Sequence, residues 1–225
     1  MKIDIDINEI LEKNKLMMEV FADILTSQKF HDLIADIVST SKTSDDLPEF
    51  IFSGVGKNWY ICEKSTKVFL SLGIQARALD CVHAIHGDLG MLASGKKKVL
   101  FFISKSGTSD ELLKLARVVK YLRGIGHLTN IKVVGLFLNT DQTGREDLYD
   151  VIITPSKKYD GALYPEFDKR DIVPSLTINT IQSILDLLGS LIYEQYPDLV
   201  ERYKYNHLAG ANGIRLGVGD LFKSI

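Results

Sequence analysis

The fold is decided by one stretch, Val99-Leu100-Phe101-Phe102-Ile103-Ser104-Lys105-Ser106-Gly107-Thr108-Ser109-Asp110-Glu111. Its first five residues are all apolar, which is typical of a strand buried on both faces. The polar turn after it leads into apolar residues at helical spacing, from Leu112 to Leu122. A buried strand followed at once by an amphipathic helix predicts a parallel sheet covered by helices.

The rest of the chain repeats this alternation on both sides of that stretch. Four further apolar runs predict strands at residues 50–52, 74–79, 131–138 and 151–153. Apolar residues three and four apart predict two helices before residue 45 and another at 181–192. We therefore expect a three-layer α/β/α sandwich with a five-stranded, mainly parallel sheet of flavodoxin-like topology.

Both ends of the chain are expected to belong to this domain. Residues 1–45 should form a helical segment that packs on residues 46–225, with Asn8 as the N-cap of its first helix. Another helix is predicted at 196–205, because Pro197 suits a first helical turn. Part of the glycine-rich tail at 209–219 is expected to be ordered.

Composition excludes several classes of protein. The 225 residues are 45% hydrophobic, which is enough for one well-buried domain. With 27 Lys and Arg against 29 Asp and Glu, no overall charge attracts nucleic acid or an anionic membrane. Cys62 and Cys81 match no disulfide framework or metal motif, and the acidic N-terminus is unlike a signal peptide. We expect a soluble cytoplasmic protein that binds no nucleic acid and no membrane.

The turn after residue 103 suits a phosphate group. Ligands of open parallel sheets bind beyond the carboxyl ends of the strands, where the next helix offers unpaired N–H groups. Serine and threonine hydroxyls supply more donors, and Gly107 allows the backbone to approach an anion. The alternative is that Ser106, Thr108 or Ser109 only caps the helix.

A nucleotide site is not supported by spacing. In Gly54-Val55-Gly56-Lys57, a P-loop would need glycine where Ile51 stands and Ser or Thr where Asn58 stands. The dinucleotide motif would need a third glycine at Trp59.

Three strings together resemble the sugar-isomerase domain of arabinose 5-phosphate isomerases. They are Ser53-Gly54-Val55-Gly56-Lys57, His86-Gly87-Asp88-Leu89-Gly90-Met91 and Ser104-Lys105-Ser106-Gly107-Thr108-Ser109, and the middle one is the specific string. The resemblance covers residues 45–218 and is weaker in the N-terminal helices. The pair of CBS domains that often follows this domain in the family is expected to be missing.

The resemblance implies four catalytic residues. Lys57 matches the lysine of the family's GxGK turn, and Glu111 matches the glutamate that opens the helix after the serine loop. Glu166 matches a glutamate eight residues before a proline, here Pro174. His207 matches the histidine of a late HPGG segment, which reads His207-Leu208-Ala209-Gly210 in this chain.

These residue types suit aldose–ketose isomerisation. The reaction needs a base at carbon, an acid and base at oxygen, and stabilisation of enediolate charge. We assign Glu111 or Glu166 as the carbon base, His207 as acid and base at oxygen or in ring opening, and Lys57 as the charge stabiliser. The ordinary alternatives are a helix-dipole role for Glu111 and a solvated loop position for Glu166.

The remaining expectations also follow from the resemblance. Relatives are typically homotetramers in which the counterpart of His207 reaches a neighbouring subunit. No cofactor is needed, because the hydrogen moves as a proton. His83 and His86 lack a third ligand at recognisable spacing, so no metal is expected. The residues expected to bind the sugar phosphate are Gly56, His86, Ser104, Ser106, Thr108, Ser109 and Thr177.

The chain also departs from the family near the site. Lys105 stands where Asn is usual, Thr108 replaces an acid, and Asn58-Trp59 replaces a small pair. We therefore expect conversion of arabinose 5-phosphate to ribulose 5-phosphate or of a related sugar phosphate. The competing interpretation is a sensor or regulator that binds a sugar phosphate without turnover, because fold alone does not imply catalysis.

Overall fold

The structure is a computed structural model that describes residues 6–93, 95–159, 164–168, 170–208 and 211–218. Its strands are β1 (Glu49–Gly54), β2 (Ala76–Ala78), β3 (Lys98–Ser104), β4 (Ile131–Phe137) and β5 (Val151–Ile153). Its α-helices are α1 (Ile7–Leu25), α2 (Gln28–Ser39), α3 (Lys57–Ser71), α4 (Gly90–Ala93), α5 (Asp110–Gly124), α6 (Leu176–Tyr193), α7 (Pro197–Asn206) and α8 (Ala211–Arg215). Short 3-10 helices lie at η1 (Ser44–Asp46), η2 (Ala84–His86), η3 (Glu146–Leu148) and η4 (Lys157–Tyr159).

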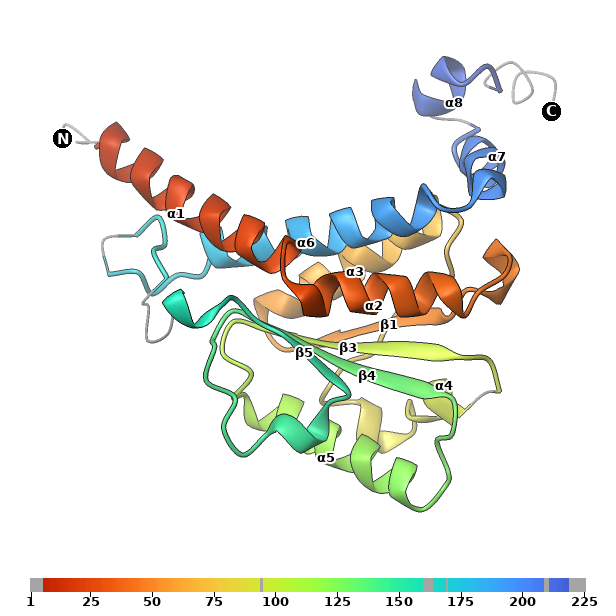
Figure 1. Ribbon diagram of the computed structural model, residues 1–225, viewed down its shortest axis with the longest axis horizontal. Helices are drawn as coiled ribbons and strands as arrows, with labels where there is room; N and C mark the ends of the chain where they lie inside the picture. The colour runs from red at the N-terminus through yellow and green to blue at the C-terminus, as the bar shows by residue number, and fades with distance from the viewer. Residues whose placement is uncertain (1–5, 94, 160–163, 169, 209–210, 219–225) are drawn as a thin grey trace.

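The five described strands form one parallel sheet in the order β2-β1-β3-β4-β5. Helices α1, α2, α3 and α6 cover one face, and α4 and α5 cover the other (Figure 1). The predicted three-layer α/β/α fold is confirmed.

Alternate residues of the central strands face opposite layers, as a strand requires. Phe50, Phe52 and Phe101 pack under α3 and α6, whereas Leu100 and Phe102 pack under α5. All five side chains are buried, and each contributes about 1.5–3 kcal/mol through burial. Burial on both sides explains why the sequence shows continuous apolar runs here.

Two local expectations need correction. The N-cap of α1 is Asp6, because its Oδ1 accepts from the N–H groups of Asn8 (3.0 Å) and Glu9 (3.1 Å); Asn8 lies inside the helix. The apolar run at 74–79 forms a strand only at Ala76–Ala78, since β2 is an edge strand paired with β1 alone.

Helices α3 and α6 run parallel, with both first turns at the carboxyl edge of the sheet. The order of their contacts shows this, because Lys64 forms an ion pair with Asp186 and Phe69 packs against Gly189 further along both helices. Among the described helices, α6 alone is long and apolar enough to cross a membrane, but half of its residues are buried in the protein. That burial is the pattern of a core helix.

The C-terminal helices form an arm at the other edge of the sheet. Helix α7 begins with Pro197, as expected, and α8 is an ordered part of the glycine-rich tail. Residues 209, 210 and 219 of that tail lie outside the described residues. In Figure 1 this arm and the amino end of α1 project from the same side of the molecule, at its two ends.

Candidate functional site

The strand order has a switch point between β1 and β3. The chain leaves β1 toward the layer of α3 and leaves β3 toward the opposite layer of α5 (Figure 1). Ligands of such sheets bind where neighbouring connections diverge in this way. The loops that meet there are residues 55–57 and residues 104–109, and we call the second one the anion loop.

The anion loop is held in shape by its own hydroxyl groups. The Gly107 N–H donates to Ser104 Oγ (3.0 Å), and the Thr108 N–H donates to Ser106 Oγ (3.2 Å). The hydroxyls of Ser106 and Thr108 are 2.7 Å apart. Gly107 has a φ of 72°, a conformation that favours glycine.

The amino end of α5 has no side-chain cap in the described residues. Ser109 occupies the N-cap position, but its hydroxyl accepts no hydrogen bond from the helix. Ser106 and Thr108 are hydrogen-bonded to each other rather than to the first turn of α5. The capping interpretation is therefore wrong, and the first-turn N–H groups are left for water or an anion.

Gln142 supports the anion loop from the β4 side. Its Nε2 donates to the carbonyl oxygens of Ser106 (3.2 Å) and Asn139 (2.9 Å), and the side chain is buried. A Cβ atom on Gly107 would stand 2.8 Å from Gln142 Oε1. Gln142 could not be predicted from the sequence, because nothing in its local pattern indicates that it contacts the loop.

Lys57 and Glu111 both begin helices at this edge. Lys57 is the first residue of α3 and follows Gly56, whose φ is 61°. Glu111 is the second residue of α5. Lys57 and Glu111 are both exposed. Among the described residues, neither side chain has a hydrogen-bond or ion-pair partner.

Glu111 also lies within electrostatic reach of β1. Burial, above all, raises the pKa of the Cys81 thiol to about 11, and the negative charges of Asp80 and Glu111 add to that rise. The Cys81 sulfur lies 3.1 Å from the hydroxyl of Ser53 at the end of β1.

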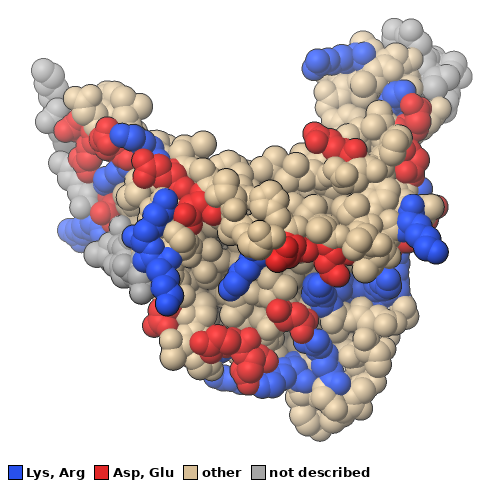
Figure 2. Space-filling view, in the orientation of Figure 1, with Lys and Arg blue, Asp and Glu red and all other residues tan. Residues whose placement is uncertain are grey.

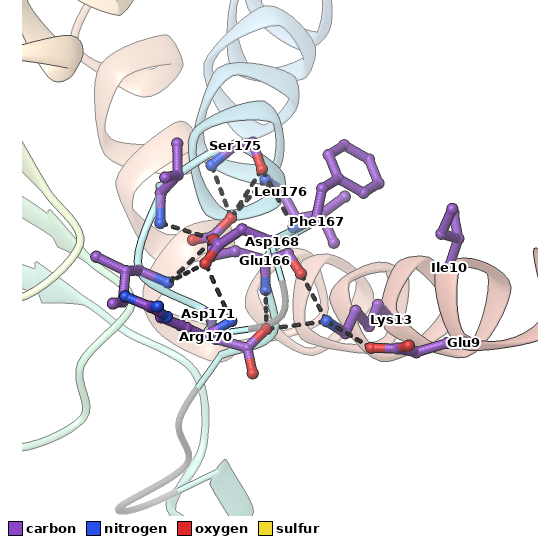
Figure 3. A network of polar contacts seen from close by, with 12 residues as sticks. Glu9, Ile10, Lys13, Glu166, Phe167, Asp168, Arg170, Asp171, Ser175 and Leu176 are labelled. Carbon is purple, nitrogen blue, oxygen red and sulfur yellow. Dashed lines mark hydrogen bonds and ion pairs between the residues drawn. The ribbon is translucent and has the colours of Figure 1, made fainter. Parts of the chain in front are cut away.

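Glu166 is completely buried, unlike the solvated residue that its polar surroundings suggest. One carboxylate oxygen, Oε2, accepts from the N–H groups of Ser175 and Leu176, both at 2.7 Å. The other, Oε1, accepts from Thr177 Oγ1 (2.5 Å) and lies 3.3 Å from Lys105 Nζ. We call these five residues the Glu166 cluster; Figure 3 shows its carboxylate against the first turn of α6.

The ionised form of Glu166 is favoured. Burial alone would raise its pKa, but donors from Thr177 and Ser175 and the charge of Lys105 together lower the pKa below the ordinary value. Thr177 is expected to bind substrate, but in this structure its hydroxyl donates a hydrogen bond to Glu166.

A second network fixes the loop that carries Glu166 to α1 (Figure 3). Lys13 Nζ donates to the Glu166 carbonyl oxygen (2.9 Å) and to Asp171 Oδ1 (3.1 Å), and it also pairs with Glu9 (3.0 Å). The same Asp171 oxygen accepts from the Glu166 N–H at 2.8 Å. The role of Lys13 could not be predicted from the sequence, since Glu166 and Asp171 lie more than 150 residues away from it.

His207 lies at the opposite edge of the molecule. The neighbouring Asn206 donates through Nδ2 to the carbonyl oxygens of Leu70 (3.2 Å) and Ser71 (3.3 Å), at the end of α3. Lys57 begins that helix, about 20 Å away at a rise of about 1.5 Å per residue. The structure thus gathers Lys57, Glu111 and the anion loop at one edge of a single chain, but not His207.

The loop that contains His86 borders the site without forming a metal centre. His86 ends η2, against which α5 packs, and it is exposed. His83 Nδ1 lies 3.2 Å from Asp80 Oδ2. In the described part of the chain, no group of three His, Cys, Asp or Glu side chains is placed to hold a metal ion.

Comparison with known proteins adds sequence and structural relatives. No family model matches the chain. The arabinose 5-phosphate isomerase KdsD of Francisella tularensis is 32% identical over 118 residues, which are 52% of this chain and 35% of that protein. The chain spans about half the length of the curated relatives it matches, or less (47%, 56% and 35%).

Two solved structures show the same fold. A proposed phosphosugar isomerase of Bacteroides fragilis, involved in capsule formation, has a TM-score of 0.70 and 22% identity, over 89% of this chain and 95% of that one. The sugar isomerase domain of an RpiR transcription factor of Sphaerobacter thermophilus has a TM-score of 0.59 and 11% identity, over 86% and 94%.

Proposed function

We propose that this chain, which has the sugar-isomerase fold and is similar in sequence to arabinose 5-phosphate isomerases, is a phosphosugar aldose–ketose isomerase. The observation that carries the proposal is the uncapped amino end of α5. There the anion loop and the first turn of α5 offer hydroxyl and N–H donors beside the carboxylate of Glu111 and across the switch point from the ammonium group of Lys57. Neither of these two charged groups has a partner among the described residues.

These groups fit the steps of the reaction. The anion loop holds the phosphate, which places the sugar chain beside the first turn of α5. Glu111 or Glu166 takes the proton from carbon, and Lys57 stabilises the enediolate oxygen. His207 transfers protons at oxygen or opens the sugar ring. Ser104, Ser106, Thr108, Ser109, Gly56, His86 and Thr177 remain the predicted binding residues.

The position of His207 supports a site that is shared between two copies of the chain. It cannot reach Lys57 of its own chain, because α3 separates them by about 20 Å. A homo-oligomer, a tetramer as in typical relatives, supplies His207 to the site of a neighbouring subunit. Figure 2 shows, in profile, a hollow between α1 and the α7–α8 arm, which leaves surface for a neighbouring copy.

The first candidate substrate is arabinose 5-phosphate, converted to ribulose 5-phosphate. Lys105 and Trp59 at the edge of the site allow a different sugar, because the family usually has smaller or uncharged residues there. The proton shift requires no cofactor.

The test is turnover in deuterated water. The purified protein is mixed separately with arabinose 5-phosphate, ribulose 5-phosphate and hexose 6-phosphates, and label at C2 is followed by proton NMR. Isomerisation with incorporation of deuterium supports the proposal. Absence of both isomerisation and deuterium incorporation with every sugar phosphate contradicts it.

The second candidate is a sugar-phosphate sensor, and it is favoured by the likeness to the sugar isomerase domain of a transcription factor. Such a protein would bind one of these sugar phosphates tightly without exchange at C2. The same experiment, combined with calorimetric titration, separates the two functions.

A further inference from the structure

We propose that Glu166 is a positioning residue that fastens the first turn of α6 to the anion loop through Lys105, and that Glu111 alone accepts the proton from carbon. This inference rests on the isomerase function proposed above. It decides which of the two glutamates is the base at carbon, a choice that the sequence leaves open.

The Glu166 carboxylate has no free acceptor position. A carboxylate offers about four lone-pair sites. Oε2 accepts from Ser175 N (2.7 Å), Leu176 N (2.7 Å), Ser175 Oγ (3.2 Å) and Thr177 N (3.4 Å). Oε1 accepts from Thr177 Oγ1 (2.5 Å) and Lys105 Nζ (3.3 Å). A base at carbon must bring an open lone pair to the C–H bond, and Glu166 has none.

Burial separates Glu166 from a substrate as well. Its residue exposure is 0%, so no surface of the side chain can contact a bound sugar without movement of α6 or of the loop. That movement is opposed from both sides of the residue. Asp171 accepts from its N–H and Lys13 donates to its carbonyl oxygen.

The surrounding charges also make Glu166 a weak base. Lys105 faces its carboxylate, and the amino end of α6 adds a positive dipole. These groups stabilise the ionised form, and proton acceptance would forfeit that stabilisation. A general base works best when its pKa lies near the working pH.

Lys105 couples this cluster to the substrate. It follows β3 directly and is part of the anion loop, and its backbone oxygen accepts from the N–H groups of Leu138 (3.1 Å) and Asn139 (2.9 Å). Its side chain reaches Glu166 while 38% of it stays exposed. The position of the anion loop is therefore tied to α6 by one ion pair.

Glu111 has the opposite properties. It is exposed, has no partner among the described residues and lies in the helix turn that the anion loop precedes. In the aldose, the C2–H bond breaks and its proton goes to Glu111, while the electron pair forms the C1=C2 bond and the C1 oxygen gains the proton of an acid. The enediol then takes the proton from Glu111 at C1, the C2 hydroxyl gives its proton to the conjugate base of that acid, and the ketone forms at C2.

The first arm of the test compares E111Q with E166Q. Deuterium exchange at C2 of bound arabinose 5-phosphate is measured by NMR, and affinity is measured by calorimetry. We expect E111Q to lose exchange by about 10²- to 10⁴-fold while affinity is kept. E166Q is expected to bind the sugar phosphate more weakly, with a loss of exchange in the saturated complex below about tenfold. The inference is overturned if E166Q loses as much deuterium exchange as E111Q does while its affinity for arabinose 5-phosphate is unchanged.

The second arm requires no turnover. Carbon-13 NMR of glutamate-labelled protein follows the titration of the Glu166 carboxyl group in the wild type, K105M, K105R and K67M. Lys67 is exposed and has no partner among the described residues, so K67M controls for loss of charge. We expect the pKa of Glu166 to rise in K105M and to stay near the wild-type value in K105R and K67M.

The two arms distinguish the inference from the proposed function. A wild-type protein that exchanges no sugar phosphate refutes the isomerase and with it the role of Glu111. The titration still decides whether Glu166 is fastened by Lys105. A Glu166 pKa that does not respond to K105M overturns that link even in an active enzyme.

Discussion

Gly107 sets the shape of the anion loop in two ways, through its positive φ and through its close approach to Gln142, and the two effects can be measured separately. Any other residue at a φ of 72° incurs about 1–2 kcal/mol, and a Cβ atom would also stand 2.8 Å from Gln142 Oε1. Gly126 has a φ of 75° and open space at the Cβ position, so G126A incurs the conformational cost alone. We predict that G107A lowers the unfolding free energy more than G126A does and weakens binding of inorganic phosphate by about tenfold or more. Thermal unfolding and phosphate titration measure both effects; equal behaviour of the two variants contradicts the prediction.

The lowered pKa of Glu166 predicts how stability depends on pH. A carboxyl group whose pKa falls on folding from its ordinary 4.5 stabilises the protein fully above that value, and this stabilisation is lost as pH falls through the folded-state pKa. E166Q leaves buried donors without their anion, so we expect it to cost about 1–3 kcal/mol at pH 7. The difference from the wild type should shrink below pH 4.5. Urea unfolding from pH 7 downward tests this, with the exposed Glu63→Gln as control; a difference that is constant down to the lowest pH contradicts it.

At the scale of elements, α1 fixes the loop at residues 166–171 through a single lysine. Lys13 has 14% side-chain exposure and bonds that loop twice. Among the described residues, Lys15 makes only an exposed pair with Glu12 on the same helix. We predict that K13M speeds hydrogen exchange at the Glu166 amide on the order of tenfold, because the Asp171 that accepts from it loses its cation. K15M should leave that amide unchanged. Equal exchange in both variants would show that α1 does not hold the loop.

Most of the strands and helices could be predicted from the sequence, because each depends on the spacing of apolar residues within a short segment. Continuous apolar runs indicated β3 and β4 correctly, since both strands are buried on both faces. The strand predicted at 74–79 is longer than β2, because Ile74 is buried outside the ladder and Leu79 follows the strand with one N–H bond to the Phe52 carbonyl oxygen. The local pattern does not distinguish Asn8 from Asp6 as the cap of α1, since residues of both types suit that position, and Asp6 is the cap in the structure.

The site was less accessible from the sequence, because its partners meet through the fold. Nothing near Glu166 indicates that the amino end of α6 and Lys105 surround it. The hydroxyls of the anion loop were found because they follow one strand, but their bonds to each other required the structure. The roles of the site residues stay predictions.

At the scale of the whole molecule, a parallel sheet places the two ends of each helix on opposite edges. Lys57 begins α3 at the carboxyl edge, and Asn206 contacts the end of α3 at the other. A histidine at that far edge can take part in chemistry only at another copy's site. The hollow between α1 and the α7–α8 arm in Figure 2 leaves surface for such a copy.

Mixing two inactive variants tests whether the site is shared between subunits. K57A lacks the charge stabiliser and H207A lacks the imidazole, so each alone should lose activity by about 10²-fold or more. In subunits exchanged at equal amounts, about one quarter of the sites would combine Lys57 of one variant with His207 of the other. We therefore predict recovery of about a quarter of wild-type activity after unfolding and refolding the two variants together. A mixture of K57A with E111Q is the control, because both residues lie at the same edge of one chain and no mixed site is complete. Recovery in neither mixture would show that His207 acts within its own chain or not at all.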